Sequence, residues 1–211
     1  MKSAFAEFRI GEFACVWARL SRRPGYSLAI LGATLLVAIT GLSGCRHQGP
    51  PVEREGPDSL ELVSNSLADG RFPASLTCDG VNTSPALAWN APPDGTGSFA
   101  LILNDRDLSE GFVHWLLFNL PPGSRSLPAS LSTQAELPDG TLQGKNDFDK
   151  IGYGGPCPGH SDHHYVFMLF ALDTKLNLPA GATRAQLDDA MKGHVLARGE
   201  LVARYHRSLS R

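Results

Sequence analysis

Short apolar runs separated by turn residues occupy most of the chain after about Ser59. Apolar or aromatic-rich runs of strand length occur at residues 99–103, 114–120 and 165–172, and residues 201–205 alternate as a final strand would. The connections carry the breakers A-P-P-D-G, P-P-G and P-D-G. Many short strands with few helices predict a mainly β domain in which two sheets pack against each other.

One helix is predicted to begin near Thr183. Thr183 is a suitable N-cap, and Gln186 three residues later completes a capping-box pattern. The apolar residues that follow recur at helical spacing and are expected to pack into the core rather than to act in a site. They are Leu187, Ala190, Met191 and Val195.

The first part of the chain has the pattern of an export signal. Basic residues precede an uncharged segment, residues 24–44, which ends in L-S-G before Cys45. Small residues directly before a cysteine resemble the bacterial lipobox, so residues 1–44 are predicted to be a cleaved signal peptide and Cys45 to carry the lipid (palmitate). A single uncleaved membrane anchor is the alternative, because 21 uncharged residues can just span a bilayer.

Three regions follow from this division. Residues 1–44 form the signal, residues 45–58 are polar and rich in Pro and Gly as a flexible tether would be, and residues 59–211 form the folded domain. The protein is thus expected to be exported and anchored in a membrane, on the periplasmic or cell-surface side. No feature distinguishes the inner from the outer membrane or identifies a protein partner.

Charge argues against nucleic acid as a partner. Removal of residues 1–44 takes away five of the 19 Lys and Arg and two of the 21 Asp and Glu, which leaves a net charge of −5. Nucleic-acid binding requires a basic face. Any anion must therefore be held by local groups and not by a global positive field.

The densest chemistry lies between Ile151 and Asp173. There a loop rich in Gly, Pro and His leads directly into an apolar run, and three imidazoles, a carboxylate and a phenol fall within residues 159–165. Glycines allow backbone N–H groups to approach a ligand, and prolines stiffen the loop. This order predicts a polar pocket at the mouth of a buried strand.

The same stretch, G-Y-G-G-P-C-P with H-H-Y-V-F-M-L-F-A-L-D, resembles a signature of the phosphatidylethanolamine-binding protein family, closest to its bacterial Raf-kinase-inhibitor-like members. Three further blocks occur in the expected order: C-D-G with S-P-A-L-A-W, L-N-D-R-D with F-V-H-W, and L-P-D-G with N-D-F. The resemblance spans roughly residues 60–207. It implies an antiparallel β-sandwich with small peripheral helices and a pocket that binds phosphate, phosphoryl head groups or similar small anions.

Matching of the blocks assigns pocket residues one by one. The resemblance implies that Asp105, His114, His163 and Tyr165 bind the ligand and that the Gly155 N–H faces the anion. Asp107 and Phe112 are assigned to the same ligand-binding set. Imidazole and phenol groups donate hydrogen bonds to phosphate oxygens, and a nearby carboxylate orients an imidazole. Each residue also has a structural interpretation: Asp105 as a turn cap, His114 as a strand-end histidine, and Tyr165 as a core residue.

Two cysteines are expected to pair. Cys15 leaves with the signal and Cys45 takes the lipid, so Cys78 and Cys157 remain in an exported domain, where disulfides are favoured. Both lie in blocks that flank the predicted pocket. Two free thiols are the alternative.

The leading function is therefore ligand binding without catalysis, cofactor or metal. The alternative is a metal-dependent or His/Asp hydrolase that uses the same pocket. The cluster G-H-S-D-H-H offers imidazoles and a carboxylate that suit zinc, but adjacent histidines on a strand point to opposite faces. A serine hydrolase is disfavoured because the chain has no G-x-S-x-G motif and no assignable nucleophile.

Overall fold

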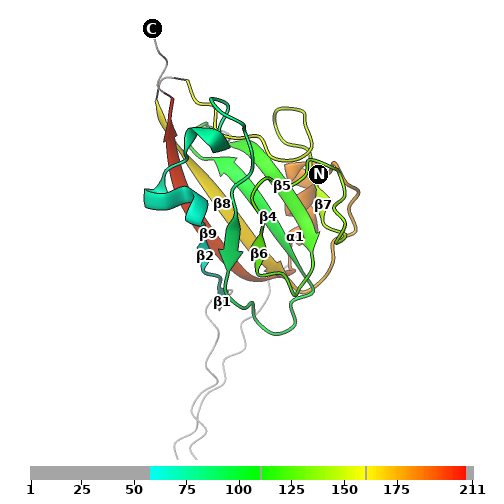
Figure 1. The fold of residues 1–211 in the computed structure, drawn as a ribbon. Coiled ribbons are helices and arrows are strands. Elements are labelled where there is room, and N and C mark those ends of the chain that lie inside the picture. Colours follow the sequence, from blue (N-terminus) through cyan, green and yellow to red (C-terminus); the bar gives the residue numbers. More distant parts are fainter. Residues whose placement is uncertain (1–57, 110, 160, 208–211) are drawn as a thin grey trace, which may run out of the picture. The chain divides into compact units, whose positions relative to one another are not determined.

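A six-stranded sheet forms the centre of the protein (Figure 1). The computed structural model describes residues 58–109, 111–159 and 161–207. Neighbouring strands of this sheet are antiparallel except β1 and β9, which are parallel. The strand order is β1 (Asp58–Ser59), β9 (Val195–His206), β8 (Asp162–Leu172), β4 (Ser98–Asp105), β5 (Phe112–Leu120) and β7 (Leu142–Gln143).

A second, three-stranded antiparallel sheet covers one face of the first. It consists of β2 (Leu62–Val63), β3 (Leu87–Trp89) and β6 (Ser126–Leu127), and two short 3-10 helices lie near it, η1 (Asn65–Gly70) and η2 (Ala74–Leu76). Between the layers lies a core of side chains from alternate positions of the long strands, because period-two alternation sends every second residue inward. Its largest members include Phe99, Trp115, Tyr165 and Phe167. The two-sheet, mainly β architecture is as predicted.

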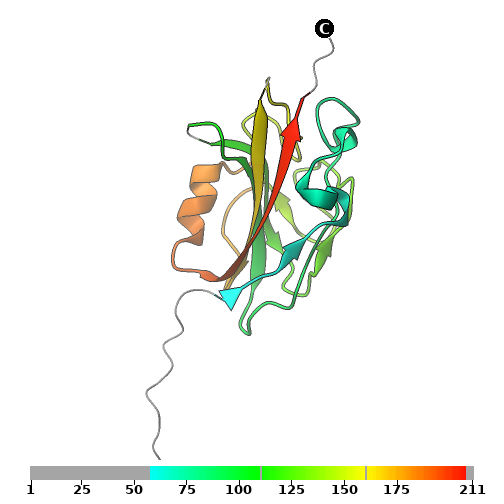
Figure 2. The same ribbon diagram turned by 90° about the vertical axis from the view of Figure 1, so that its left-hand side faces the viewer.

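The opposite face of the large sheet is covered by α1 (Arg184–Met191), the one α-helix among the residues that the structure describes, as Figure 2 shows. Thr183 caps it through the predicted capping box with Gln186. Leu187 and Met191 are buried in a second core, which includes Ile102 from the outer face of β4.

Val195 was predicted to extend this helix, and that prediction is wrong. The helix ends at Met191, and Gly193 adopts the left-handed conformation, with φ of +80°, which turns the chain into β9. The final strand therefore begins at Val195 and runs through Gly199. A Cβ at Gly199 would lie 2.4 Å from the Leu60 carbonyl oxygen, so this glycine allows a neighbouring segment to pass closely.

Residues 1–57 lie outside the described residues, and with them the predicted signal peptide, Cys45 and the tether up to residue 57. Within the described part of the chain, no helix has the length and apolar character needed to cross a membrane.

Candidate functional site

Three long strands bring the predicted site residues to one end of the large sheet. Strand β4 finishes at Asp105, and this residue pairs with Phe112 at the start of β5 and with Tyr165 near the start of β8. Antiparallel pairing places the end of one strand beside the beginning of the next. Residues separated by more than 50 positions in the sequence thus lie together at this edge.

A β-bulge directs His114 toward this group. Leu103 pairs with Trp115 and Asn104 pairs with Val113, which leaves His114 as the extra residue on β5. Such a bulge alters the direction of a side chain without ending the strand. The His114 ring packs edge-to-face on Tyr165 at 5.1 Å between ring centroids and on Phe148 at 5.2 Å.

The strand ends line a cavity of about 270 Å³. Its polar groups come from Asp105, His114, His163 and Tyr165, and its apolar wall comes from Leu108, Phe112 and Phe148. The loop that follows the second cysteine completes the lining with Cys157, Pro158 and Gly159. Five of the residues assigned to the ligand from the sequence therefore line one cavity: Asp105, Phe112, His114, His163 and Tyr165.

The Asp105 carboxylate organises the polar side of the cavity. Asp105 is 3% exposed, and its Oδ2 lies 2.6 Å from Nδ1 of His163. Its Oδ1 accepts the backbone N–H of Asp107 at 3.0 Å, so the turn-cap interpretation of Asp105 is also correct. A carboxylate with two such partners holds the imidazole in one orientation.

His114 is held in a defined tautomer. Its Nδ1 lies 2.7 Å from the Gly154 carbonyl oxygen, which can only accept, so Nδ1 carries the proton. The ring is buried, and burial lowers the pKa of His114 below its usual value, although the Gly154 carbonyl and Asp105 act in the opposite direction. At neutral pH this imidazole is therefore uncharged, with a lone pair on Nε2.

The Tyr165 hydroxyl stays protonated throughout the physiological range. Burial raises the pKa of Tyr165, and the neighbouring Asp105 carboxylate raises it further. The tyrosine therefore contributes a neutral hydroxyl to the cavity. Its ring is fully buried and contacts Phe72, so Tyr165 belongs to the core and also lines the cavity.

Two of the assigned residues do not line this cavity. The Asp107 carboxylate accepts hydrogen bonds from the backbone N–H and from Nδ1 of His164, which lowers the pKa of Asp107 and attaches its loop to β8. The N–H of Gly155 donates to Oδ1 of Asn82 at 2.8 Å, and Gly155 lines a neighbouring cavity instead. The expectation that this N–H faces the anion is corrected, because Asn82 already occupies it.

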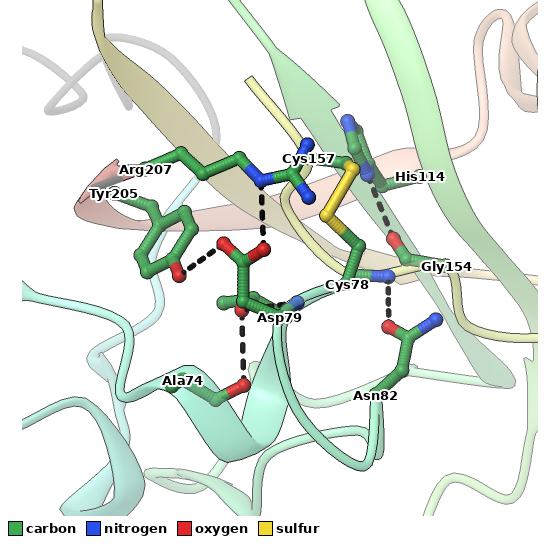
Figure 3. The surroundings of a disulfide bond; sticks show 11 residues. Ala74, Cys78, Asp79, Asn82, His114, Gly154, Cys157, Tyr205 and Arg207 are labelled. Carbon is green, nitrogen blue, oxygen red and sulfur yellow. Dashed lines mark hydrogen bonds and ion pairs between the residues drawn. A yellow bond between two sulfur atoms is a disulfide. The ribbon is translucent and has the colours of Figure 1, made fainter. Parts of the chain in front are cut away.

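The predicted disulfide joins Cys78 and Cys157, with 5.4 Å between their Cα atoms (Figure 3). The Cys78 N–H also donates to the Pro156 carbonyl oxygen at 3.1 Å. Next to the bridge, Asp79 accepts hydrogen bonds from the Tyr205 hydroxyl and from Nε of Arg207, both at 2.7 Å. The bridge thus attaches the loop that lines the cavity to a second loop and, through it, to the end of β9.

The sequence interpretation missed several cavity residues. Phe148 lies on a loop shaped by Asn146, whose Oδ1 accepts the N–H groups of Phe148 and Lys150. Asn146 and Phe148 both stand in a block that carried the family resemblance, and that signal could have identified the wall. Pro158 and Gly159 also stand in the Gly- and Pro-rich stretch that the sequence analysis singled out, although they were not assigned to the ligand. Leu108 lies in a loop that no local pattern marked.

The histidine cluster is divided between two faces of β8. The His163 side chain bonds Asp105, whereas the side chain of its neighbour His164 bonds Asp107. His160 lies outside the described residues. Among the residues that the structure describes, no group of three or more His, Cys, Asp or Glu could hold a metal ion.

Comparisons with known proteins show which family this chain resembles. A profile of the family described as Phosphatidylethanolamine-binding protein matches residues 63–206. A UPF0098 protein of Methanothermobacter thermautotrophicus is 45% identical over 150 residues, which cover 70% of this chain and 99% of that protein. The UPF0098 protein YbcL of Escherichia coli is 36% identical over 160 residues, which cover 70% of this chain and 87% of YbcL.

Two solved structures resemble the chain along most of its described length. A homologue of phosphatidylethanolamine-binding proteins from Chlamydia trachomatis superimposes with a TM-score of 0.65 at 33% identity, covering 72% of this chain and 99% of that one. The structure of Escherichia coli YbcL, described as a new member of the mammalian family, gives a TM-score of 0.66 at 31% identity and covers 71% and 99% of the two chains.

Proposed function

The chain belongs to the phosphatidylethanolamine-binding protein family. We propose that it binds a small anion in the cavity at the end of β4, either inorganic phosphate or the phosphoryl group of a larger molecule such as a phospholipid head group. The observation that carries the proposal is the convergence of Asp105, His114, His163 and Tyr165 on that cavity. Imidazole and phenol groups are hydrogen-bond donors suited to phosphate oxygens.

The protonation states of the cavity define the form of ligand that it favours. The cavity contains a buried carboxylate, Asp105, and a neutral His114 whose Nε2 is an acceptor. A phosphate monoanion satisfies His114 because its P–OH group can donate to Nε2. A dianion has no such proton, so its binding requires an imidazole to take up one, which converts an acceptor into a charged donor. We therefore expect proton uptake to accompany the binding of a dianion.

The sequence supports an extracytoplasmic, lipid-anchored location for this binding protein. The L-S-G-C pattern at residues 42–45 follows an apolar segment with a basic flank. The disulfide between Cys78 and Cys157 is of the kind that persists in oxidising compartments. Cells grown with radiolabelled palmitate should yield a labelled protein, and Cys45→Ser should abolish the label. Full labelling of the variant would contradict the assignment of Cys45.

Calorimetric titration of the full chain with inorganic phosphate at pH 6 tests the binding site. His163→Gln should weaken binding at least about tenfold, because it removes the imidazole that Asp105 orients. His194→Gln is the matched control, since His194 also bonds an aspartate, Asp173, at 2.7 Å but does not line the cavity.

The two variants separate a local effect from a general one. Loss of phosphate binding in His163→Gln but not in His194→Gln would support the cavity as the anion site. Equal affinity in both variants and the wild-type protein would place any bound anion elsewhere and refute the assignment.

A further inference from the structure

A serine hydroxyl lies at hydrogen-bond distance from the imidazole that Asp105 orients. Nε2 of His163 lies 3.1 Å from Oγ of Ser161, and Nδ1 of the same ring lies 2.6 Å from Oδ2 of Asp105. A nucleophile, a base and a group that orients the base are thus connected in series. The sequence did not indicate this, because Ser161 lies in no recognised motif and Asp105 is 56 positions away.

The hydrogen bonds of this series favour one protonation pattern. Carboxylate oxygens accept hydrogen bonds, so Nδ1 of His163 is the donor in its short contact with Asp105. In the neutral ring Nε2 then carries a lone pair, and the Ser161 hydroxyl can donate to it. Asp105 is held in place from a second side by the Asp107 N–H, and only 14% of the His163 side chain is exposed. The base therefore has a fixed direction toward the serine.

The surroundings offer space for an apolar acyl group. His163 lines the cavity whose wall is formed by Leu108, Phe112 and Phe148. Ser161 itself is exposed, directly before β8, so its hydroxyl is open to an incoming substrate. The cavity volume of about 270 Å³ suits a short or aromatic acyl chain better than a long lipid tail.

We propose that Ser161, His163 and Asp105 form a catalytic set that hydrolyses small carboxylic esters whose acyl group enters this cavity. Ser161 is the nucleophile and His163 the general base, whereas Asp105 is a positioning residue. The activity goes beyond anion binding and does not depend on it, although both would use His163.

The reaction needs only an ester and water. Ser161 Oγ forms a bond to the ester carbonyl carbon while Nε2 of His163 takes the hydroxyl proton. The bond from that carbon to the alcohol oxygen then breaks, and the alcohol leaves with the proton from His163. Water attacks the acyl-serine, His163 again takes and returns a proton, and the carboxylic acid departs with Ser161 restored.

A fluorophosphonate provides a test that does not depend on the natural substrate. Its phosphorus exchanges fluoride for an activated serine Oγ, so the full chain should gain one adduct, and peptide mapping should locate it on Ser161. Ser161→Ala should prevent labelling, and His163→Gln should slow it at least about 100-fold, as expected when a general base is lost. The rate for Ser126→Ala, which removes an exposed serine from β6, should equal that of the wild-type protein.

Hydrolysis of 4-nitrophenyl butyrate by the same proteins gives a second readout. A burst of nitrophenol that disappears in Ser161→Ala would support the acyl-serine. Absence of an adduct on Ser161, or labelling whose rate is unchanged in His163→Gln, would overturn the proposal. Phosphate titration of Ser161→Ala separates the two functions, because loss of the nucleophile should leave anion binding intact.

Discussion

The disulfide offers the sharpest test of how the fold maintains the cavity. Cys78 and Cys157 are 79 positions apart, and in the chain-entropy description a crosslink over a loop of this length stabilises the folded state by about 4.5 kcal/mol. A domain of this size has a total stability of about 5–15 kcal/mol. The double variant Cys78→Ala/Cys157→Ala should therefore lose a large part of its free energy of unfolding.

The structure also indicates a local effect on ligand binding. Pro158 and Gly159 line the cavity directly after Cys157. Without the bridge, this loop keeps the hydrogen bonds from Cys78 N–H to the Pro156 carbonyl and from Gly155 N–H to Asn82. Net hydrogen bonds of this kind contribute about 1 kcal/mol each. The double variant should thus fold but bind phosphate more weakly than the wild-type protein.

Urea unfolding of the full chain measures the first effect, and phosphate titration below the transition measures the second. Wild-type protein reduced with dithiothreitol serves as the control, because it lacks the bridge but keeps both thiols. A loss of less than about 1 kcal/mol in both the variant and the reduced protein would refute the reasoning from loop closure. An unchanged phosphate affinity in a destabilised variant would show that the bridge supports the fold without shaping the cavity.

Two further predictions concern pH dependence, and a third concerns a glycine. The pKa of His114 is lowered in the folded state, so its contribution to stability is present above about pH 6.5 and declines as pH falls through the folded pKa. The free energy of unfolding in urea should therefore fall with pH more steeply for the wild-type protein than for His114→Phe. For a dianion, phosphate affinity should fall by up to about tenfold per pH unit between pH 7 and 8, and a constant affinity would exclude linked proton uptake. Gly155→Ala should destabilise the fold by about 1–3 kcal/mol, since its Cβ would lie 2.3 Å from the Leu76 carbonyl oxygen, whereas Gly123→Ala, with open space around it, should not.

The framework of the fold was predictable because its long strands are apolar enough to be recognised locally. The runs at residues 99–103, 114–120 and 165–172 correspond to β4, β5 and β8. Strand β4 extends beyond its run at both ends, whereas β5 and β8 extend only at their starts. The polar ends were missed because Asp105 and Asp162 are poor strand formers in isolation and depend on cross-strand pairing. The final strand was predicted only for residues 201–205, whereas β9 begins at Val195 and includes Gly199, which pairs with Leu169.

The candidate site was only partly predictable. Residue types and blocks pointed to Asp105, His114 and His163, and the strand register brings them together. The bulge that directs His114, the occupation of the Gly155 N–H by Asn82 and the contact between Ser161 and His163 are tertiary features. No periodicity in the sequence encodes them, so the nucleophile candidate could be found only from coordinates.

The parallel pairing of β1 with β9 places the start of the described chain far from the cavity. Asp58 pairs with Ala197 at one end of β9, whereas Tyr205, which pairs with His163, lies near the other end. At ~3.3 Å per residue the two positions are about 26 Å apart along the strand. Figure 1 shows β1 at the lower end of the sheet. The described chain therefore begins at the end of the domain opposite the opening of the cavity. Suppose that the lipid on Cys45 anchors the protein and that the domain stands with β1 nearest the membrane. The opening of the cavity then points away from that membrane. Diffusible solutes, or a surface facing that membrane, would then reach the cavity more readily than head groups of the leaflet in which the protein is anchored.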